Sequence, residues 1–283
     1  MFIDTHAHLD FPAFEGEMDA ILERAAQAGV TRIITIGTSV ESSRRAVALA
    51  EAHPSIYAAI GIHPDAAMDA EPGAMGILRE LARNPRVVAI GETGLDYYRL
   101  PSSRTVHNRV DALGDEETAD LQAAIEDGAV KAAQASVFQG QLDLAVECGL
   151  NVVIHQRGDC MEDTLNLLAP YRGKLQAVFH CFGGSPETAA ELLTMGHLVS
   201  FTGIVTFKNA PLVQASAASV PEGSFMVETD CPYLSPVPFR GKRCEPAYTR
   251  QTAEKIASLR NQPLKRVAEM TTAAAEAFFR LAR

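Results

Sequence analysis

Eight short apolar runs, separated by segments with helical spacing, are the feature that most limits what this 283-residue chain can fold into. The runs are near-continuous in apolar residues, as is typical of strands buried on both faces of a parallel sheet. Between them, apolar residues recur every three or four positions, which predicts helices. Eight strand–helix units that close on themselves form an α/β fold of the (β/α)8 or TIM barrel type. The expected strands are residues 2–8, 32–37, 56–62, 87–90, 151–155, 176–180, 198–203 and 225–230.

One stretch interrupts this alternation. Residues 100–133, after the fourth expected strand, contain no apolar run of the required kind and many charged side chains. We therefore expect a single domain over residues 1–283, with an insertion after strand four that is partly helical around residues 116–125. An insertion at this end of a barrel can serve as a lid, but a solvated decoration is the simpler interpretation.

The acidic charge balance argues against one class of function. The formal net charge of −10 does not suit a protein that holds nucleic acid on a broad basic face. Phosphate chemistry stays open, because bound divalent cations reverse the local charge in a cleft. Five scattered cysteines without a CxxC pair indicate reduced thiols, and the sequence shows neither a secretory leader nor an apolar run of about 18 residues. We expect a cytoplasmic protein that does not contact membranes, and these patterns leave its oligomeric state open.

Side chains that can bind metals stand at the ends of five of the expected strands. His6 and His8 are two residues apart at the end of the first strand, so they point to the same face. A barrel brings the carboxyl ends of its strands to one mouth, where residues far apart in sequence meet. Six residues have this placement: His6, His8, Glu92, His155, His180 and Asp230.

Four imidazoles and two carboxylates are more than one tetrahedral ion with an open position needs. Taken singly, each residue has an ordinary explanation as a core histidine, a structural acid or a turn cap, but the convergence of all six favours a metal site. The set suits two divalent cations about 3.5–4 Å apart that share a carboxylate. Mg²⁺, Mn²⁺ and Zn²⁺ are the candidates, because such sites take several metals. We expect Glu92 to bridge, with His6, His8 and Asp230 on one ion and His155 and His180 on the other.

Five sequence strings carry a resemblance to a known family. The chain resembles the TatD family of metal-dependent deoxyribonucleases nearly end to end, apart from the insertion. The resemblance implies a barrel hydrolase, related to the amidohydrolases, that cleaves phosphodiester bonds, often by 3′→5′ removal of nucleotides from single-stranded DNA ends. The six residues named above match the family's metal ligands. The strings are Asp4-Thr5-His6-Ala7-His8, Gly91-Glu92-Thr93-Gly94-Leu95-Asp96, His180-Cys181-Phe182, Glu228-Thr229-Asp230-Cys231-Pro232-Tyr233-Leu234 and Arg240-Gly241-Lys242-Arg243.

Two positions depart from the family pattern. Cys244 stands where Asn is usual, and Gly183 follows the His-Cys-Phe string where Ser is common. Neither position is a ligand, so we expect both to bear on substrate preference.

Glu92 and Asp230 are the expected catalytic residues. Two cations would lower the pKa of a shared water toward about 7 and offset charge on the phosphate, and Asp230 would accept or relay the proton of that water. Arg157 and Arg240 are expected to hold the phosphate. His63, at the end of the third strand, is expected to contact the substrate or a ligand.

Two other functions stay open on the sequence alone. A related barrel metallohydrolase would act on amides, lactones or phosphotriesters. Many such enzymes bridge their metals with a carbamylated lysine on the fourth strand, where this chain has Glu92. A metal-loaded scaffold that only binds a partner is the second alternative, and it would not need a complete ligand set.

Overall fold

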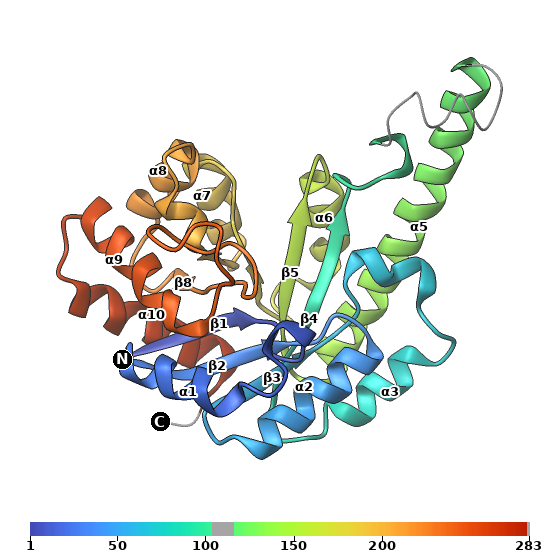
Figure 1. Ribbon diagram of the computed structural model, residues 1–283. Helices are drawn as coiled ribbons and strands as arrows, with labels where there is room; N and C mark the ends of the chain where they lie inside the picture. The colour runs from blue at the N-terminus through green and yellow to red at the C-terminus, as the bar shows by residue number, and fades with distance from the viewer. Residues whose placement is uncertain (104–115, 282–283) are drawn as a thin grey trace.

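Eight parallel strands form the centre of the structure, a computed structural model that describes residues 1–103 and 116–281. They follow one another in sequence order around a single sheet, which confirms the expected barrel (Figure 1). The strands are β1 (Phe2–Ala7), β2 (Val30–Ile36), β3 (Ile56–Ile60), β4 (Val87–Asp96), β5 (Asn151–Arg157), β6 (Ala177–Phe179), β7 (Leu198–Phe201) and β8 (Phe225–Val227).

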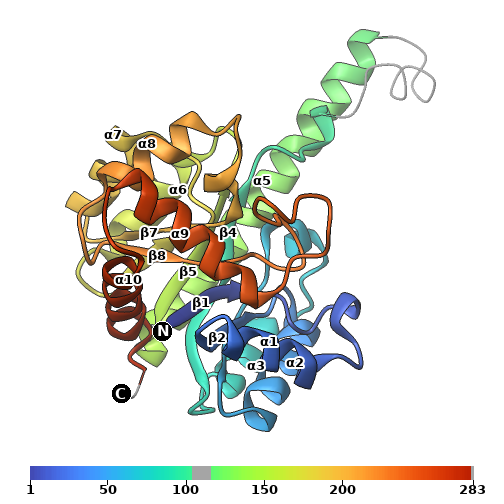
Figure 2. The same ribbon diagram turned by 60° about the vertical axis from the view of Figure 1, so that its left-hand side comes forward.

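Helices surround the sheet and connect its strands (Figures 1 and 2). Within the described ranges, none of them combines the length and the apolar character that crossing a lipid bilayer would require. The helices are α1 (Met18–Gln27), α2 (Val40–Ala52), α3 (Ala74–Leu81), α5 (Glu116–Cys148), α6 (Met161–Leu168), α7 (Pro186–Thr194), α8 (Pro211–Ser219), α9 (Thr249–Leu259) and α10 (Leu264–Phe279).

The seam between β1 and β8 nearly closes the barrel. One isolated parallel bridge joins Ala7 to Cys231. The N–H of His8 donates to the carbonyl of Cys231, and the N–H of Asp230 donates to the carbonyl of His6, both at 2.8 Å. Closure therefore depends on the backbone of the segments that carry three of the expected ligands.

The interior of the barrel is a packed apolar core. Each of the eight strands contributes at least one side chain to one buried cluster, for example Ile3 from β1, Val153 from β5 and Met226 from β8. Phe278 and Phe279, at the end of α10, join the same cluster. Ile3 lies near the start of β1, so the end of α10 that packs in the same cluster covers the amino-terminal end of the barrel. The carboxyl end is left for the site.

The expected insertion differs from the structure in the length of its helix. The helix expected around residues 116–125 of the insertion is confirmed, but it does not end there: it continues to Cys148 as α5, a single helix that projects beyond the barrel (Figures 1 and 2). Residues 120–137 include six alanines and no proline, a composition that favours an unbroken helix. Residues 104–115 of the expected insertion lie outside the described residues.

Candidate metal centre

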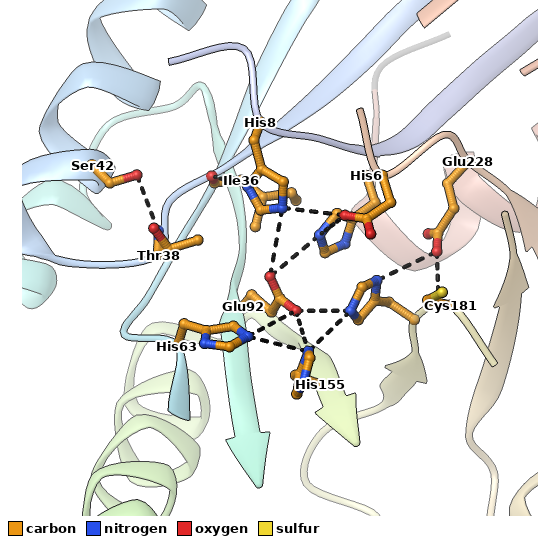
Figure 3. Close-up of polar contacts among 12 residues, drawn as sticks. His6, His8, Ile36, Thr38, Ser42, His63, Glu92, His155, Cys181 and Glu228 are labelled. Atoms are coloured by element: carbon orange, nitrogen blue, oxygen red, sulfur yellow. Dashed lines mark hydrogen bonds and ion pairs between the residues drawn. The ribbon is translucent and has the colours of Figure 1, made fainter. Parts of the chain in front are cut away.

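The six expected ligands meet at the carboxyl end of the barrel (Figure 3). Three of them lie within strands, in β1, β4 and β5, and the other three lie just beyond β1, β6 and β8. Strands β1, β6 and β8 end at Ala7, Phe179 and Val227, which is earlier than the sequence predicts. The residues within strands are His6, Glu92 and His155, and those beyond are His8, His180 and Asp230.

Glu92 lies at the centre of this group and is only 3% exposed. Its Oε2 is 3.4 Å from Nε2 of His6 and 3.8 Å from Nε2 of His8. Its Oε1 is 2.7 Å from Nδ1 of His155 and 2.8 Å from Nε2 of His180. The two carboxylate oxygens therefore face two separate pairs of imidazoles.

Asp230 completes the group on the side of the first two histidines. Its Oδ1 is 3.3 Å from Nε2 of His8 and 3.7 Å from Nε2 of His6. Its φ of 59° lies in the left-handed region, which Asp adopts more readily than most residues. Donor atoms that share one tetrahedral ion at about 2.0–2.2 Å lie about 3.3–3.6 Å apart. The spacings around His6, His8, Glu92 and Asp230 are close to that size.

His6 provides an independent test of whether a metal ion fits here. Its ring is fully buried, and neither ring nitrogen has a hydrogen-bond partner among the described residues. The ring stacks on that of His180, with centroids 3.9 Å apart. A buried nitrogen without a partner is unfavourable, and a cation at Nε2 of His6 would satisfy it. The donor set of imidazoles and carboxylates suits a divalent metal such as Zn²⁺ or Mn²⁺.

The protonation states of Glu92 and His6 suit a cation, whereas in His8, His155 and His180 burial is outweighed by nearby carboxylates, which raise the pKa. Burial raises the pKa of Glu92, but His180, His63 and His6 outweigh burial and hold that pKa well below its usual value. Burial lowers the pKa of His6, and the nearby His180 lowers it further. Glu92 is therefore ionised and His6 is neutral, the forms in which these side chains bind metals.

Two carboxylates that the sequence interpretation did not assign to the site contact ligand histidines from behind. Oε1 of Glu228 is 3.4 Å from Nδ1 of His180, and Oδ2 of Asp96 is 3.3 Å from Nε2 of His155. Both carboxylates are buried. Partners of this kind orient a ligand ring and fix which nitrogen carries the proton. Asp96 lies four residues after Glu92, and Glu228 lies two residues before Asp230. Residues an even number of positions apart on a strand point to the same face, so this spacing could have indicated both carboxylates.

His63 lies among the ligands. Its Nε2 is 3.3 Å from Nδ1 of His155 and 3.7 Å from Oε1 of Glu92, and burial lowers its pKa to about 4. The backbone just before it is held by Gln141 of α5, whose amide pairs with both the N–H and the carbonyl of Ile62, at 2.8 and 3.0 Å. His63 was expected to contact substrate or a ligand, and the structure places it beside two ligands.

The two arginines expected to hold phosphate lie farther out. Both are exposed, and each guanidinium stacks on an aromatic ring. Arg157 lies 4.2 Å from the ring centroid of Tyr98, and Arg240 lies 3.7 Å from that of Phe207. Among the described residues, neither arginine forms an ion pair with a carboxylate, in contrast to Arg24, which pairs with Glu245.

Comparison with known proteins gives a consistent result. A family model described as TatD related DNase matches residues 3–280. YabD of Bacillus subtilis (strain 168), described as an uncharacterized metal-dependent hydrolase, is 36% identical over 282 residues, which cover 99% of this chain and 100% of that protein. The 3′-5′ ssDNA/RNA exonuclease TatD of Enterobacter lignolyticus is 34% identical, over 92% of this chain and 91% of its own. The crystal structure of YJJV, a TatD homolog from Escherichia coli K12, superposes with a TM-score of 0.83 at 28% identity, covering 99% of this chain and 98% of that one. The chain therefore belongs to the TatD-related DNase family of metal-dependent hydrolases.

Proposed function

We propose that this enzyme is a deoxyribonuclease that removes nucleotides from the 3′ ends of single-stranded DNA with two divalent cations. The observation that carries the proposal is Glu92, whose two oxygens face two separate pairs of imidazoles. The name of the Enterobacter lignolyticus relative, a 3′-5′ ssDNA/RNA exonuclease, supports the substrate class. The net charge of −10 suits engagement of a frayed end more than of a long duplex. Five free cysteines suit the reducing cytoplasm, where we place the enzyme.

The ligand residues divide between the two ions around Glu92. When bound, the ions activate a water molecule and offset charge that develops on the phosphate. The protein contributes the fixed positions of the donor atoms and their protonation states. One ion would be held by His6, His8, Glu92 and Asp230, and the other by Glu92, His155 and His180.

Residues around the ligands would handle the proton and the phosphate. Asp230 contacts the histidines through Oδ1, which leaves Oδ2 to accept a proton from the attacking water. Arg157 and Arg240 are held in place by their aromatic partners, and their N–H edges can bind phosphate oxygens.

The test is a cleavage assay with a 5′-labelled single-stranded oligonucleotide. We expect the metal-loaded protein to produce a ladder shortened from the 3′ end, and we expect no cleavage after chelation with EDTA. Glu92→Gln should lose activity while its circular dichroism spectrum stays unchanged, whereas Glu222→Gln, at an exposed position, should keep it. Full activity of Glu92→Gln or of the stripped protein would contradict the metal mechanism. Turnover of amides or lactones without oligonucleotide cleavage would favour the related metallohydrolase.

A further inference from the structure

Three of the histidines around Glu92 share one feature on the side of the ring that faces away from it. On that side, one ring nitrogen lies near an oxygen atom that can accept a hydrogen bond but cannot donate one. A neutral imidazole carries one N–H and one lone pair. If a cation took the lone pair of the nitrogen that faces Glu92, the proton of the ring would lie on the far nitrogen, next to this oxygen. The three contacts are His8 Nδ1 with the carbonyl of Ile36 at 3.2 Å, His155 Nε2 with Oδ2 of Asp96 at 3.3 Å, and His180 Nδ1 with Oε1 of Glu228 at 3.4 Å.

This arrangement prepares the three rings as metal ligands. The nitrogen that faces Glu92 would then offer its lone pair to the cation. In His8 and His180 this nitrogen is Nε2, and in His155 it is Nδ1. With a cation bound, the oxygen atoms behind the rings would therefore favour the tautomer that a metal site needs.

His63 has the opposite arrangement. Its far nitrogen, Nδ1, accepts a hydrogen bond at 3.0 Å from the backbone N–H of Asp65, because His63 caps the short helix η2 (Pro64–Asp69). The carboxylate of Asp65 is farther from Nδ1, at 3.9 Å, and pairs with Arg99. The lone pair of Nδ1 is therefore in use, and the proton of the neutral ring lies on Nε2, the nitrogen that faces the ligands.

We propose that His63 is a fixed, neutral hydrogen-bond donor to an oxygen atom of the substrate, and that it is not a metal ligand. In the structure its Nε2 lies 3.3 Å from Nδ1 of His155 and 3.7 Å from Oε1 of Glu92. If ions occupied the acceptor positions of these two ligands, the N–H of His63 would be left to bind a substrate oxygen. A neutral imidazole does not release its remaining proton, so His63 would stabilise charge on the oxygen without transferring a proton. The identity of that oxygen, a phosphodiester oxygen, rests on the proposed function.

The tautomer can be measured without any substrate. The full chain, labelled with ¹⁵N-histidine and loaded with ¹¹³Cd²⁺, would be studied by long-range ¹H–¹⁵N correlation. We expect His63 to show a protonated Nε2 and an unprotonated Nδ1, and we expect ¹¹³Cd coupling to one nitrogen each of His8, His155 and His180. Coupling of ¹¹³Cd to His63, or a protonated Nδ1 of His63, would overturn the proposal.

Matched variants test the role in the reaction. His63→Leu and His63→Gln should bind as many Zn²⁺ ions as the unchanged protein, whereas His180→Leu should bind one fewer. With an oligonucleotide substrate, kcat should fall about 10- to 100-fold in His63→Leu, the loss expected for one hydrogen bond to a charged oxygen. His63→Gln should recover part of that loss, because its amide can donate a hydrogen bond.

Loss of an ion from His63→Leu, or an unchanged kcat of this variant, would contradict the proposal. If the unchanged protein cleaves no oligonucleotide, the proposed function fails, and the ¹¹³Cd result still decides whether His63 is a ligand.

Discussion

Glu228 contacts His180 from behind, with Oε1 of the carboxylate 3.4 Å from Nδ1 of the ring and both side chains buried. The carboxylate is itself fixed. Its Oε2 accepts a hydrogen bond from the hydroxyl of Ser200, and its Oε1 accepts one from the backbone N–H of Cys181, both at 2.7 Å. A fixed carboxylate holds the ring so that Nε2 of His180 faces Glu92.

Replacing this carboxylate should weaken metal binding. We expect Glu228→Gln to lower the affinity for one of two Zn²⁺ ions about 10- to 100-fold, because an amide orients the ring of His180 less firmly. Competition with a chromophoric chelator would measure the change. Glu222→Gln, which alters an exposed carboxylate paired with Arg266, is the matched control and should bind as the unchanged protein does. Equal affinity in both variants would show that Glu228 does not position the ring.

Metal binding should also stabilise the folded chain. An ion that binds only the folded state adds about 2.7 kcal/mol to the free energy of unfolding when its concentration is 100 times its Kd. We therefore expect the thermal midpoint of the stripped protein to rise as Zn²⁺ or Mn²⁺ is added. Glu92→Gln should show a much smaller rise, because Glu92 faces both pairs of imidazoles. The same rise in both proteins would place the ions elsewhere.

The barrel was predictable because its strands are continuous apolar runs, but the strand ends were not. An end depends on where backbone hydrogen bonding to the neighbouring strand stops, and single-sequence patterns do not contain that information. The chain turns at Cys181 and Asp230, which have φ values of 48° and 59°. The length of α5 was missed because its first half projects from the barrel and most of its apolar side chains are not packed (Figure 2). Ala123 is buried there, but Leu121 and Ile125 are exposed, so the sequence shows no clear helical period.

The candidate ligands were predictable because strand ends converge whatever the details of packing. The residues behind them depend on contacts between strands that are not adjacent. Glu228 follows β8 and reaches His180, which follows β6, across Ser200 of β7. The hydrogen bond from Asp65 to His63 depends on the local turn. Even spacing from Asp230 marks Glu228 as a candidate, but the sequence does not show which histidine it contacts, nor that the backbone turns at His63.

Gln141 should be important for the stability of the fold next to the ligand group. Its amide pairs with the N–H and the carbonyl of Ile62 and with the hydroxyl of Thr93, at 2.8, 3.0 and 2.5 Å, and the side chain is fully buried. Gln141→Ala leaves buried backbone groups without partners, so we expect the free energy of unfolding to fall by about 2–4 kcal/mol in urea titrations. Gln122→Ala, at an exposed position of the same helix, should change it by less than about 0.5 kcal/mol. Similar losses in the two variants would contradict this role.

Arg157 should contribute to substrate binding more than to the chemical step. Its guanidinium stacks on Tyr98 outside the ligand group, where it can contact a phosphate that is not being cleaved. A contact made equally in the bound substrate and in the transition state changes KM and leaves kcat unchanged. We therefore expect Arg157→Ala to raise KM for an oligonucleotide about 10-fold, which corresponds to the weaker end of charge-assisted hydrogen bonds, and to reduce the dependence of KM on salt. Arg250→Ala, which removes an exposed arginine paired with Glu254 on α9, is the control and should change neither constant. A fall in kcat at constant KM would instead place Arg157 at the scissile phosphate, where its charge would act on the transition state.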